Sequence, residues 1–536
     1  METSSRKRKA SDDAPRATKK QKLVMPITRR VLPPLTLAIK PMDFQNETIE
    51  FARKHNGRIY LGDDMGLGKT LQAIATMLEY RKEWPLLIIT PPVLKTQWKA
   101  ELLKFVNGLI ADDIVIASKG TDPVGGWIDI VPYSLIGSKC DELVKRKYKC
   151  IIMDEGHYCK DHKSVRSKAA LKIAAGANRK MILSGTPILN MPKDLFAPLR
   201  ILDIDDRLRE SVRKYQASKL GTNKEIVVDP KLFANYKMFT VRYCGGRLDP
   251  KFNRWWDMGS TNGDELHHVL FDCCMIRRKK EQVLDQLPPK FRHASLIDIG
   301  SKHRNAMMAI MKDARSSSKE TMREMFRQGQ LMMKLYSTNA ESKVEPVADY
   351  LKEVFSNSDG KFVIFAHHRV MLDAIEDMLE ANFRTDGQGE TSWIRIDGDT
   401  KDDRHLLCQE FQNNPKCKYA LLSITAAGAG ITLTAANHVI FTEIYWSPAS
   451  LRQAEDRIYR IGQTKTCFIT YLVGKDSYDQ YLWKVIDRKL KASAQVIDGE
   501  VATKMVDITK HVDALEMESD DAREEAALEY LESLTK

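Results

Sequence analysis

The sequence lacks the long apolar runs and the paired cysteines of several large protein classes. No apolar run in its 536 residues reaches the ~18 residues that cross a bilayer, and the N-terminus has no apolar signal-peptide core. The nine cysteines form no C-x-x-C pair, and several lie inside apolar runs, as Cys150 does. We therefore expect an intracellular protein without membrane contact, zinc site or disulfide bond.

Positive charge is concentrated in the body of the chain. The formal net charge is +12, while residues 1–30 carry +7 and residues 512–536 carry −7, so residues 31–511 hold the whole excess. A basic body suits a protein that follows a polyanion, although an ordinary basic enzyme could have the same charge. Two basic clusters within residues 1–30 resemble a bipartite nuclear-import signal, which predicts a nuclear location, or a tail that adds affinity for phosphate.

A candidate phosphate-binding loop occupies residues 62–70, between a short apolar run and an amphipathic segment. Backbone N–H groups of such a loop would hold a nucleotide's β-phosphate, with Lys69 bridging the β- and γ-phosphates and Thr70 binding Mg²⁺. The strict pattern has glycine at position 63, where this chain has Asp63. The strand–loop–helix context favours a nucleotide site over a plain glycine-rich turn.

Short apolar runs alternate with helical stretches in both halves of the chain. In the first half the predicted strands are residues 58–61, 86–90, 113–117, 128–131, 149–154 and 180–184. In the second half they are residues 361–366, 393–396, 419–424, 437–441 and 467–472. Such alternation predicts an α/β fold with doubly wound parallel sheets. Residues 195–345 lose the alternation and are expected to be largely helical.

Carboxylates follow one predicted strand, and paired arginines lie far downstream. Asp154 and Glu155 end a buried strand, so Asp154 could hold Mg²⁺ through water while Glu155 orients or deprotonates the attacking water. Arg457 and Arg460 are three residues apart and share one helical face. Taken alone, the carboxylates could belong to a solvated turn, and the arginines could form surface ion pairs. Together with the phosphate loop, they predict a hydrolytic site completed by an arginine finger.

In this order, the segments resemble helicase superfamily two and specifically its Swi/Snf-like double-stranded-DNA translocases. The resemblance covers most of residues 37–495. Its motifs are the adenine-reading pair Phe44-Gln45, motif I at 64–70, motif II at 154–157, motif III at 183–190 and motif VI at 453–463. Motif I of this family likewise lacks the first strict glycine, and Gly156 stands where alanine or serine is commoner.

The resemblance implies an ATP hydrolase that closes two RecA-like parallel-sheet lobes around ATP·Mg²⁺. Lobe 1 would span residues 37–204, helical insertions and a linker 205–345, and lobe 2 residues 346–495, flanked by a basic disordered tail over 1–36 and an acidic helical tail over 496–536. Nucleotide would be bound by Gln45, Asp64, Met65, Gly66, Leu67, Gly68, Lys69 and Thr70. Mg²⁺ would be bound by Thr70 and Asp154, and catalysis would use Lys69, Asp154, Glu155, Arg457 and Arg460. The DNA track would include Lys95, Tyr133, His367, His368, Arg369, Ser423 and Thr425.

Within that family, the sequence is most similar to the annealing-helicase, fork-remodelling subfamily. The segments that carry this likeness are residues 80–87, 242–244, 365–368, 394–398, 423–427 and 481–483. The expected partners are double-stranded or branched DNA and replication-fork proteins. The alternative is a nucleosome remodeller that uses the same motor. A catalytically silent DNA-binding scaffold would have lost Lys69, Asp154, Glu155 or Arg460, and all four are present.

Overall fold

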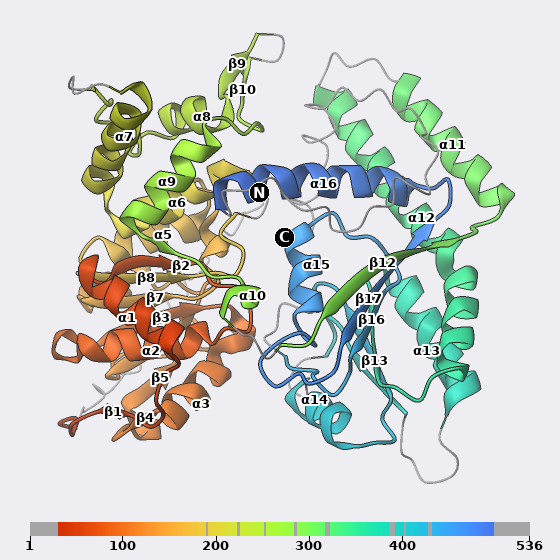
Figure 1. Ribbon diagram of the computed structural model, residues 1–536, viewed down its shortest axis with the longest axis horizontal. Coiled ribbons are helices and arrows are strands. Elements are labelled where there is room, and N and C mark those ends of the chain that lie inside the picture. The colour runs from red at the N-terminus through yellow and green to blue at the C-terminus, as the bar shows by residue number, and fades with distance from the viewer. Residues whose placement is uncertain are drawn as a thin grey trace, which may run out of the picture.

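The chain forms two α/β lobes that lie side by side (Figure 1). The computed structural model describes residues 30–188, 191–221, 226–250, 253–283, 287–316, 322–384, 392–400, 404–426 and 431–497. The predicted fold class, two parallel-sheet lobes with helical insertions, is confirmed. Both predicted tails, apart from their residues nearest the lobes, lie outside the described residues, as does the end of motif III at Asn190.

Lobe 1 is built on a seven-stranded parallel sheet of order β11-β2-β8-β7-β3-β6-β5. Its strands are β2 (Arg58–Leu61), β3 (Leu86–Thr90), β5 (Ile114–Ile116), β6 (Ile128–Pro132), β7 (Cys150–Met153), β8 (Arg179–Leu183) and β11 (Met275–Ile276). In β3, Leu86 and Ile88 face one apolar cluster and Leu87 and Ile89 face another. The sheet is therefore buried on both faces, which explains why its strands are continuous apolar runs.

Helices cover both faces of this sheet (Figure 1). They are α1 (Asp43–Lys54), α2 (Lys69–Glu79), α3 (Lys95–Phe105), α4 (Cys140–Lys145), α5 (Val165–Ala174) and α6 (Phe196–Leu202). A small antiparallel pair, β1 (Thr36–Leu37) with β4 (Val106–Asn107), ties the start of the lobe to the end of α3.

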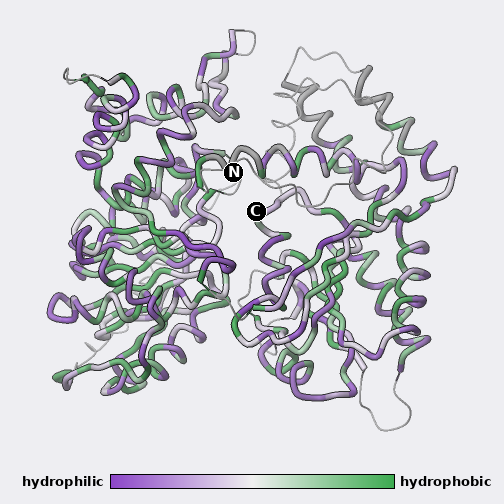
Figure 2. The backbone as a smooth tube through the Cα atoms, in the orientation of Figure 1, coloured by the Kyte–Doolittle hydropathy of each residue, from purple (hydrophilic) through white to green (hydrophobic). Residues whose placement is uncertain are grey.

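Lobe 2 is built on a six-stranded parallel sheet of order β12-β17-β16-β13-β15-β14. The strands are β12 (Lys290–Ile297), β13 (Phe362–Ala366), β14 (Trp393–Ile396), β15 (Tyr419–Ser423), β16 (His438–Phe441) and β17 (Cys467–Gly474). The helices that follow them are α13 (Arg369–Phe383), α14 (Arg404–Asn413), α15 (Pro448–Glu455) and α16 (Tyr478–Ile497). Apolar residues concentrate on the central strands of each lobe (Figure 2).

The middle of the chain supplies helices and also strands. Its helices are α7 (Asp205–Leu220), α8 (Tyr236–Cys244), α9 (Gly263–Cys273), α10 (Lys280–Val283), α11 (Ser301–Ser316) and α12 (Met322–Ser356), and β9 (Arg247–Asp249) pairs with β10 (Arg254–Trp256) as a hairpin. The sequence pattern did not predict β11 or β12. β11 has only two residues, and β12 is an edge strand that mixes polar with apolar side chains and is mostly exposed or half-buried.

The chain passes twice between the lobes. β11 pairs with β2 in lobe 1, and β12 pairs with β17 in lobe 2, so the first crossing lies between them. α16 makes the return (Figure 1). It starts on β17 and ends with Val496 and Ile497 in the apolar cluster of lobe 1, where His267 Nδ1 lies 2.9 Å from the Val496 carbonyl oxygen. Among the helices that the structure describes, none has the length and apolarity needed to cross a membrane.

Candidate active site

The loop over residues 62–68 joins β2 to α2, in the strand–loop–helix order that the sequence predicts. Gly66 and Gly68 have φ angles of 87° and 72°, in the left-handed region that favours glycine, and Gly68 caps α2. Lys69 begins α2, and its Nζ donates to the carbonyl oxygens of Asp63 (2.8 Å) and Asp64 (3.1 Å). Burial lowers the pKa of Lys69 against the pull of nearby carboxylates.

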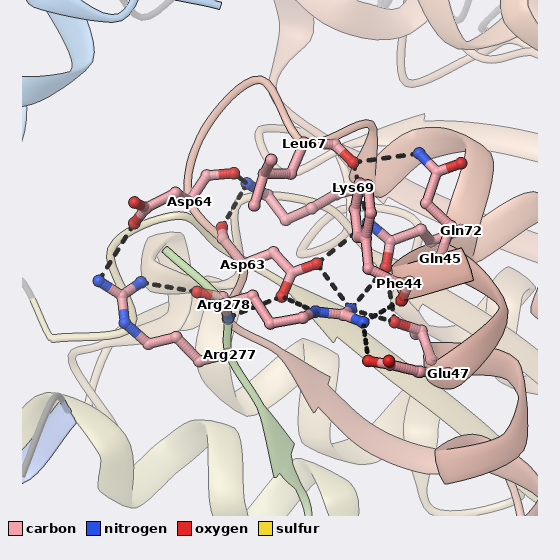
Figure 3. Close-up of polar contacts among 12 residues, drawn as sticks. Phe44, Gln45, Glu47, Asp63, Asp64, Leu67, Lys69, Gln72, Arg277 and Arg278 are labelled. Carbon is pink, nitrogen blue, oxygen red and sulfur yellow. Dashed lines mark hydrogen bonds and ion pairs between the residues drawn. The ribbon is translucent and has the colours of Figure 1, made fainter. Parts of the chain in front are cut away.

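Asp63, at the position of the missing glycine, is the buried anchor of this loop. Its carboxylate accepts hydrogen bonds from Arg278 Nη2 (2.8 Å), Arg278 Nε (3.1 Å) and Gln72 Nε2 (3.1 Å). The same guanidinium also donates to the Phe44 carbonyl of α1 (Figure 3). It donates to the Thr48 hydroxyl of the same helix as well. One buried ion pair therefore fixes the loop to α1, to α2 and to the segment after β11.

Gln45, the expected adenine reader, contacts the loop directly. Its Nε2 donates to the Leu67 carbonyl at 3.2 Å, and its Oε1 accepts from the Met42 backbone N–H at 3.0 Å. These bonds occupy part of the donor and acceptor capacity of the amide. Gln45 thus supports the phosphate loop as well as lining the cavity described below.

Asp154 and Glu155 follow β7 at the carboxyl edge of the sheet. Asp154 accepts hydrogen bonds from Trp98 Nε1 (2.8 Å) and Thr90 Oγ1 (3.3 Å). Burial and the neighbouring charge of Glu155 raise the pKa of Asp154 to about 6. Burial acts in the same direction on Glu155, but the hydrogen bond and charge of His157 together with the charges of Lys69 and Arg457 outweigh it, so the pKa of Glu155 lies below its ordinary value. Glu155 also has a left-handed backbone, with φ at 51°, which is uncommon outside glycine.

The departure from the family pattern at Gly156 has a steric cause. A methyl group on Gly156 would lie 2.1 Å from Cγ2 of Ile182, a buried residue of β8. Alanine or serine would require this branched side chain to move. Glycine at 156 and isoleucine at 182 are therefore matched in shape.

A cavity of about 590 Å³ between the lobes brings the predicted catalytic residues together. Its walls include Gln45, Met65, Gly66, Gly68, Lys69, Thr70, Asp154 and Glu155 from lobe 1 and Thr432, Arg457 and Arg460 from lobe 2. Two predicted nucleotide-binding residues do not line it. The Leu67 side chain is buried, and the Asp64 carboxylate lies 3.2 Å from Arg277 Nη2.

The arginine pair follows α15 and faces the phosphate loop. Arg457 Nη1 and Arg460 Nη1 each donate to the Ile431 carbonyl at 3.2 Å, and Arg460 also donates to Thr432 Oγ1 at 2.5 Å. Within the described parts of the chain, Nε of Arg457 is buried and has no hydrogen-bond acceptor. Burial and the charge of Arg460 lower the pKa of Arg457 to about 10. A polyanion in the cavity would supply both the missing acceptor and the missing counter-charge.

The oxygen ligands available for a metal ion fit Mg²⁺. Thr70 and Asp154 line the cavity, and no cluster of three or more His, Cys, Asp or Glu residues suitable for a metal occurs among the residues described. Mg²⁺ usually keeps several waters and binds one or two protein oxygens plus substrate phosphates, so a closed protein cage is not required.

The predicted DNA-contacting residues of lobe 1 and of the end of β15 are not all accessible to solvent. Lys95 is partly exposed at the start of α3, and Thr425 is exposed. Ser423 is buried and shares a 2.8 Å hydrogen bond with Thr425. Tyr133 is 2% exposed and stacks on Tyr158, because its side chain turns into the core of lobe 1. This burial is incompatible with the expected contact of Tyr133 with DNA.

The residues after β13 form a third part of the candidate track. His368 Nδ1 lies 2.5 Å from Glu443, and Arg369 is 75% exposed. His367 packs between aromatic rings, and burial together with the charge of His368 lowers its pKa to about 4. Arg369 is therefore the accessible cation of this group.

Sequence reasoning missed residues that hold the site from outside the motifs. Arg278 lies 215 positions from Asp63 along the chain, and Trp98 lies 56 positions from Asp154. The only signal was the basic run at 277–280, directly after an apolar pair, in a region expected to be helical. Arg278 and Lys280 in that run are buried, and charged side chains are rarely buried unless they are paired, as these two are with Asp63 and Asp456.

The fold and the split cavity define a two-lobed phosphate-loop protein of helicase architecture. Comparison with known proteins gives the family. Residues 44–343 match the SNF2-related domain, and residues 342–462 match the helicase conserved C-terminal domain. The chain belongs to the SNF2-related family.

Three similar proteins illustrate the range of relatives. The SWI/SNF-related matrix-associated actin-dependent regulator of chromatin subfamily A-like protein 1 of Xenopus laevis is 36% identical over 85% of this chain and 44% of its own length. The human DNA annealing helicase and endonuclease ZRANB3 is 34% identical over 87% of this chain and 41% of its own length. The Sulfolobus solfataricus SWI2/SNF2 ATPase core, solved in complex with dsDNA, is 21% identical over 88% of this chain and all of its own, with a TM-score of 0.39. The chain spans less than half the length of the two curated relatives.

Replacing Arg278 by methionine is expected to destabilise lobe 1. The Arg278→Met variant leaves the Asp63 carboxylate buried without its counter-charge, and breaking a buried pair in this way costs about 3–5 kcal/mol. The free energy of unfolding, measured by urea titration with tryptophan fluorescence, should fall by that amount.

The matched control is Arg53→Met, because Arg53 pairs with Glu79 at an exposed site. That change should cost less than about 1 kcal/mol. Adding Asp63→Leu to Arg278→Met should recover part of the loss, since the uncompensated charge is then gone. Equal losses for Arg278→Met and Arg53→Met would contradict the anchoring role.

Proposed function

We propose that this protein is a DNA-dependent ATP hydrolase that translocates on double-stranded DNA and anneals or remodels forked DNA. The observation that carries the proposal is the cavity between the lobes. Lobe 1 contributes a phosphate loop and two carboxylates to it, and lobe 2 contributes two arginines. Neither lobe alone has the charges needed for phosphoryl transfer, so hydrolysis requires both.

Each residue of the cavity has a role that its position supports. Lys69 and the loop N–H groups bind the phosphates, and Glu155 orients and deprotonates the attacking water. Arg457 and Arg460 stabilise the negative charge that spreads over the transferred phosphoryl group. Mg²⁺, held by Thr70 and Asp154, would neutralise phosphate charge. Gln45 reads the adenine edge with the hydrogen-bonding capacity that the loop leaves free.

The accessible members of the candidate DNA track are Lys95, Arg369 and Thr425. They follow parallel strands of the two sheets, so one duplex could touch both lobes. Contacts from such residues go mainly to phosphate, which makes affinity depend on salt and little on sequence. The net charge of +12 supports the same kind of binding.

Forked DNA is favoured over nucleosomes by the subfamily likeness of the motif segments. The human relative is named an annealing helicase, whereas the Xenopus relative is named a regulator of chromatin, so nucleosome remodelling is the second candidate. ATPase rates with single-stranded, duplex, forked and nucleosomal DNA, compared side by side, discriminate the two. Highest stimulation by nucleosomes would replace the fork assignment. The basic clusters in residues 1–30 support a nuclear location.

Two substitutions test the division of labour between the lobes. Lys69→Ala should abolish ATP hydrolysis without unfolding the protein. Arg460→Ala should retain ATP binding and lower turnover by roughly 10³-fold or more, the range found for arginine fingers. Turnover is read by phosphate release, and binding by a fluorescent ATP analogue.

The control for both is Lys82→Ala, which removes an exposed lysine outside the cavity. It should leave DNA-stimulated turnover unchanged. Normal turnover by Lys69→Ala would refute the nucleotide site, and normal turnover by Arg460→Ala would refute the finger.

The pKa of Asp154 predicts how hydrolysis depends on pH. Because this pKa is raised to about 6, the carboxyl is protonated below that value and the charged, metal-binding form is lost as pH falls through it. The value of kcat/KM for ATP should therefore rise between pH 5 and 7, with an apparent pKa near 6. A higher Mg²⁺ concentration should move this rise of kcat/KM to lower pH, since the cation favours the charged carboxylate over the protonated form. A profile unaffected by Mg²⁺ would count against Asp154 as the titrating group.

A further inference from the structure

Residues 275–280 connect the phosphate loop to the arginine pair. Arg277 Nη1 donates to the Gly62 carbonyl at 2.7 Å, and Arg278 pairs with Asp63 (Figure 3). Both contacts attach this segment to lobe 1. Lys280 is a further buried charged side chain of this segment, and it belongs to none of the sequence motifs.

Lys280 contacts both lobes. Its backbone N–H donates to the Asp64 carboxylate of the phosphate loop at 3.2 Å. Its Nζ donates to Asp456 Oδ1 at 2.5 Å and to the Tyr459 carbonyl at 2.6 Å, both in lobe 2. The Lys280 side chain is 3% exposed and that of Asp456 is 14% exposed, so water screens this ion pair little.

The two lobe 2 partners of Lys280 flank the arginines. Asp456 precedes Arg457, and Tyr459 precedes Arg460. α15 ends at Glu455, and residues 456–460 continue from it as a turn. The first part of this turn is tied to α15 by backbone bonds, such as that from the Tyr459 N–H to the Glu455 carbonyl at 3.3 Å. An ammonium group bonded to both ends of this turn restricts the directions in which the two guanidinium groups can point.

Packing at Gly66 shows how closely these segments approach. A methyl group on Gly66 would lie 2.9 Å from Cβ of Arg460 and 3.6 Å from Cε of Lys280. The phosphate loop, Lys280 and the arginine turn therefore meet at one point. The contact requires glycine in the loop and a closed arrangement of the lobes.

The residue before the turn is held by a separate group. Glu455 is buried and accepts hydrogen bonds from Arg292 at 2.7 Å and Lys290 at 3.2 Å, both on β12, and from the Tyr471 hydroxyl at 2.7 Å. These partners all belong to the lobe 2 sheet, so they fix Glu455 within lobe 2. Among the hydrogen bonds and ion pairs described for the turn, those of Lys280 are the ones that connect it to the phosphate loop of lobe 1.

We propose that Lys280 is a positioning residue for ATP hydrolysis, which holds the turn at 456–460 against the phosphate loop so that Arg457 and Arg460 face the γ-phosphate. The inference rests on the proposed function of the cavity. Because Lys280 does not line the cavity, it acts on the arginines and not on the nucleotide. Its loss should therefore lower kcat and leave the affinity for ATP in place.

The test uses the full chain with four variants: Lys280→Met, Lys280→Arg, Asp456→Asn and the double variant Lys280→Met/Asp456→Asn. Misplacing catalytic groups by about 1 Å can cost on the order of 10²-fold, so kcat of Lys280→Met should fall by about that factor with KM for ATP within about threefold. Lys280→Arg should recover part of the rate. The double variant should be no slower than Lys280→Met, because either change alone breaks the pair.

Lys302→Met is the control, since it removes an exposed lysine of α11. It should leave kcat and KM unchanged. Thermal melting of each variant separates lost folding from lost positioning. If Lys280→Met does not fold, Asp456→Asn replaces it, because this change breaks the same ion pair. A kcat equal to wild type in Lys280→Met, a rise in KM alone, or multiplicative losses in the double variant would overturn the proposal.

Small-angle scattering separates this proposal from the proposed function. Without nucleotide, Lys280→Met should have a larger radius of gyration than wild type, because the Lys280–Asp456 pair joins the lobes. If wild type hydrolyses no ATP, the proposed function fails and the positioning role fails with it. Unequal radii would then still support the ion pair as a contact between the lobes, and equal radii would refute that contact too.

Discussion

The buried ion pair between Asp63 and Arg278 is the contact on which the nucleotide cavity depends. A phosphate loop is held in most proteins by its glycines and by the helix that follows. Here a carboxylate replaces one glycine, and its counter-charge comes from a segment 215 residues downstream. The guanidinium also bonds to α1, so the adenine side and the phosphate side of the cavity share one support. Burying both charges is costly, and the geometry compensates by bonding nearly every donor and acceptor.

Charge in the cavity is divided between the lobes. Lobe 1 contributes the acids and three lysines, Lys40, Lys69 and Lys104, and lobe 2 contributes two arginines whose charges repel one another. Repulsion between Asp154 and Glu155 and repulsion between the two arginines both raise the free energy of this arrangement without a ligand. A bound polyanion and its cation would relieve both, so substrate binding and closure of the lobes favour one another.

Regular structure and local chemistry could be predicted from the sequence, whereas long-range supports could not. The parallel strands are apolar runs that can be recognised in the sequence. Lys69 and Asp154 follow such runs within a few residues, and the two arginines are three residues apart, so short stretches of sequence were enough to identify them. β12 escaped prediction because this edge strand mixes polar with apolar side chains without a regular period, and β11 because two residues carry no period. Arg278 and Lys280 looked like surface charges, since their partners are distant in sequence. Tyr133 showed the opposite error, because a strand-end position does not reveal which way a side chain turns.

α16 has a mechanical consequence for the motion of the two lobes. It is a continuous helix of 20 residues, about 30 Å long, whose first turns pack on β17 and whose last residues sit in the lobe 1 core. Because α16 is attached to both lobes, the lobes can rotate about its two ends, but the distance between these ends changes little. When the cavity opens, one lobe therefore rotates relative to the other with the length of α16 as a nearly constant radius. A larger displacement of the lobes would require the C-terminal end of α16 to leave the apolar cluster of lobe 1 around Val496.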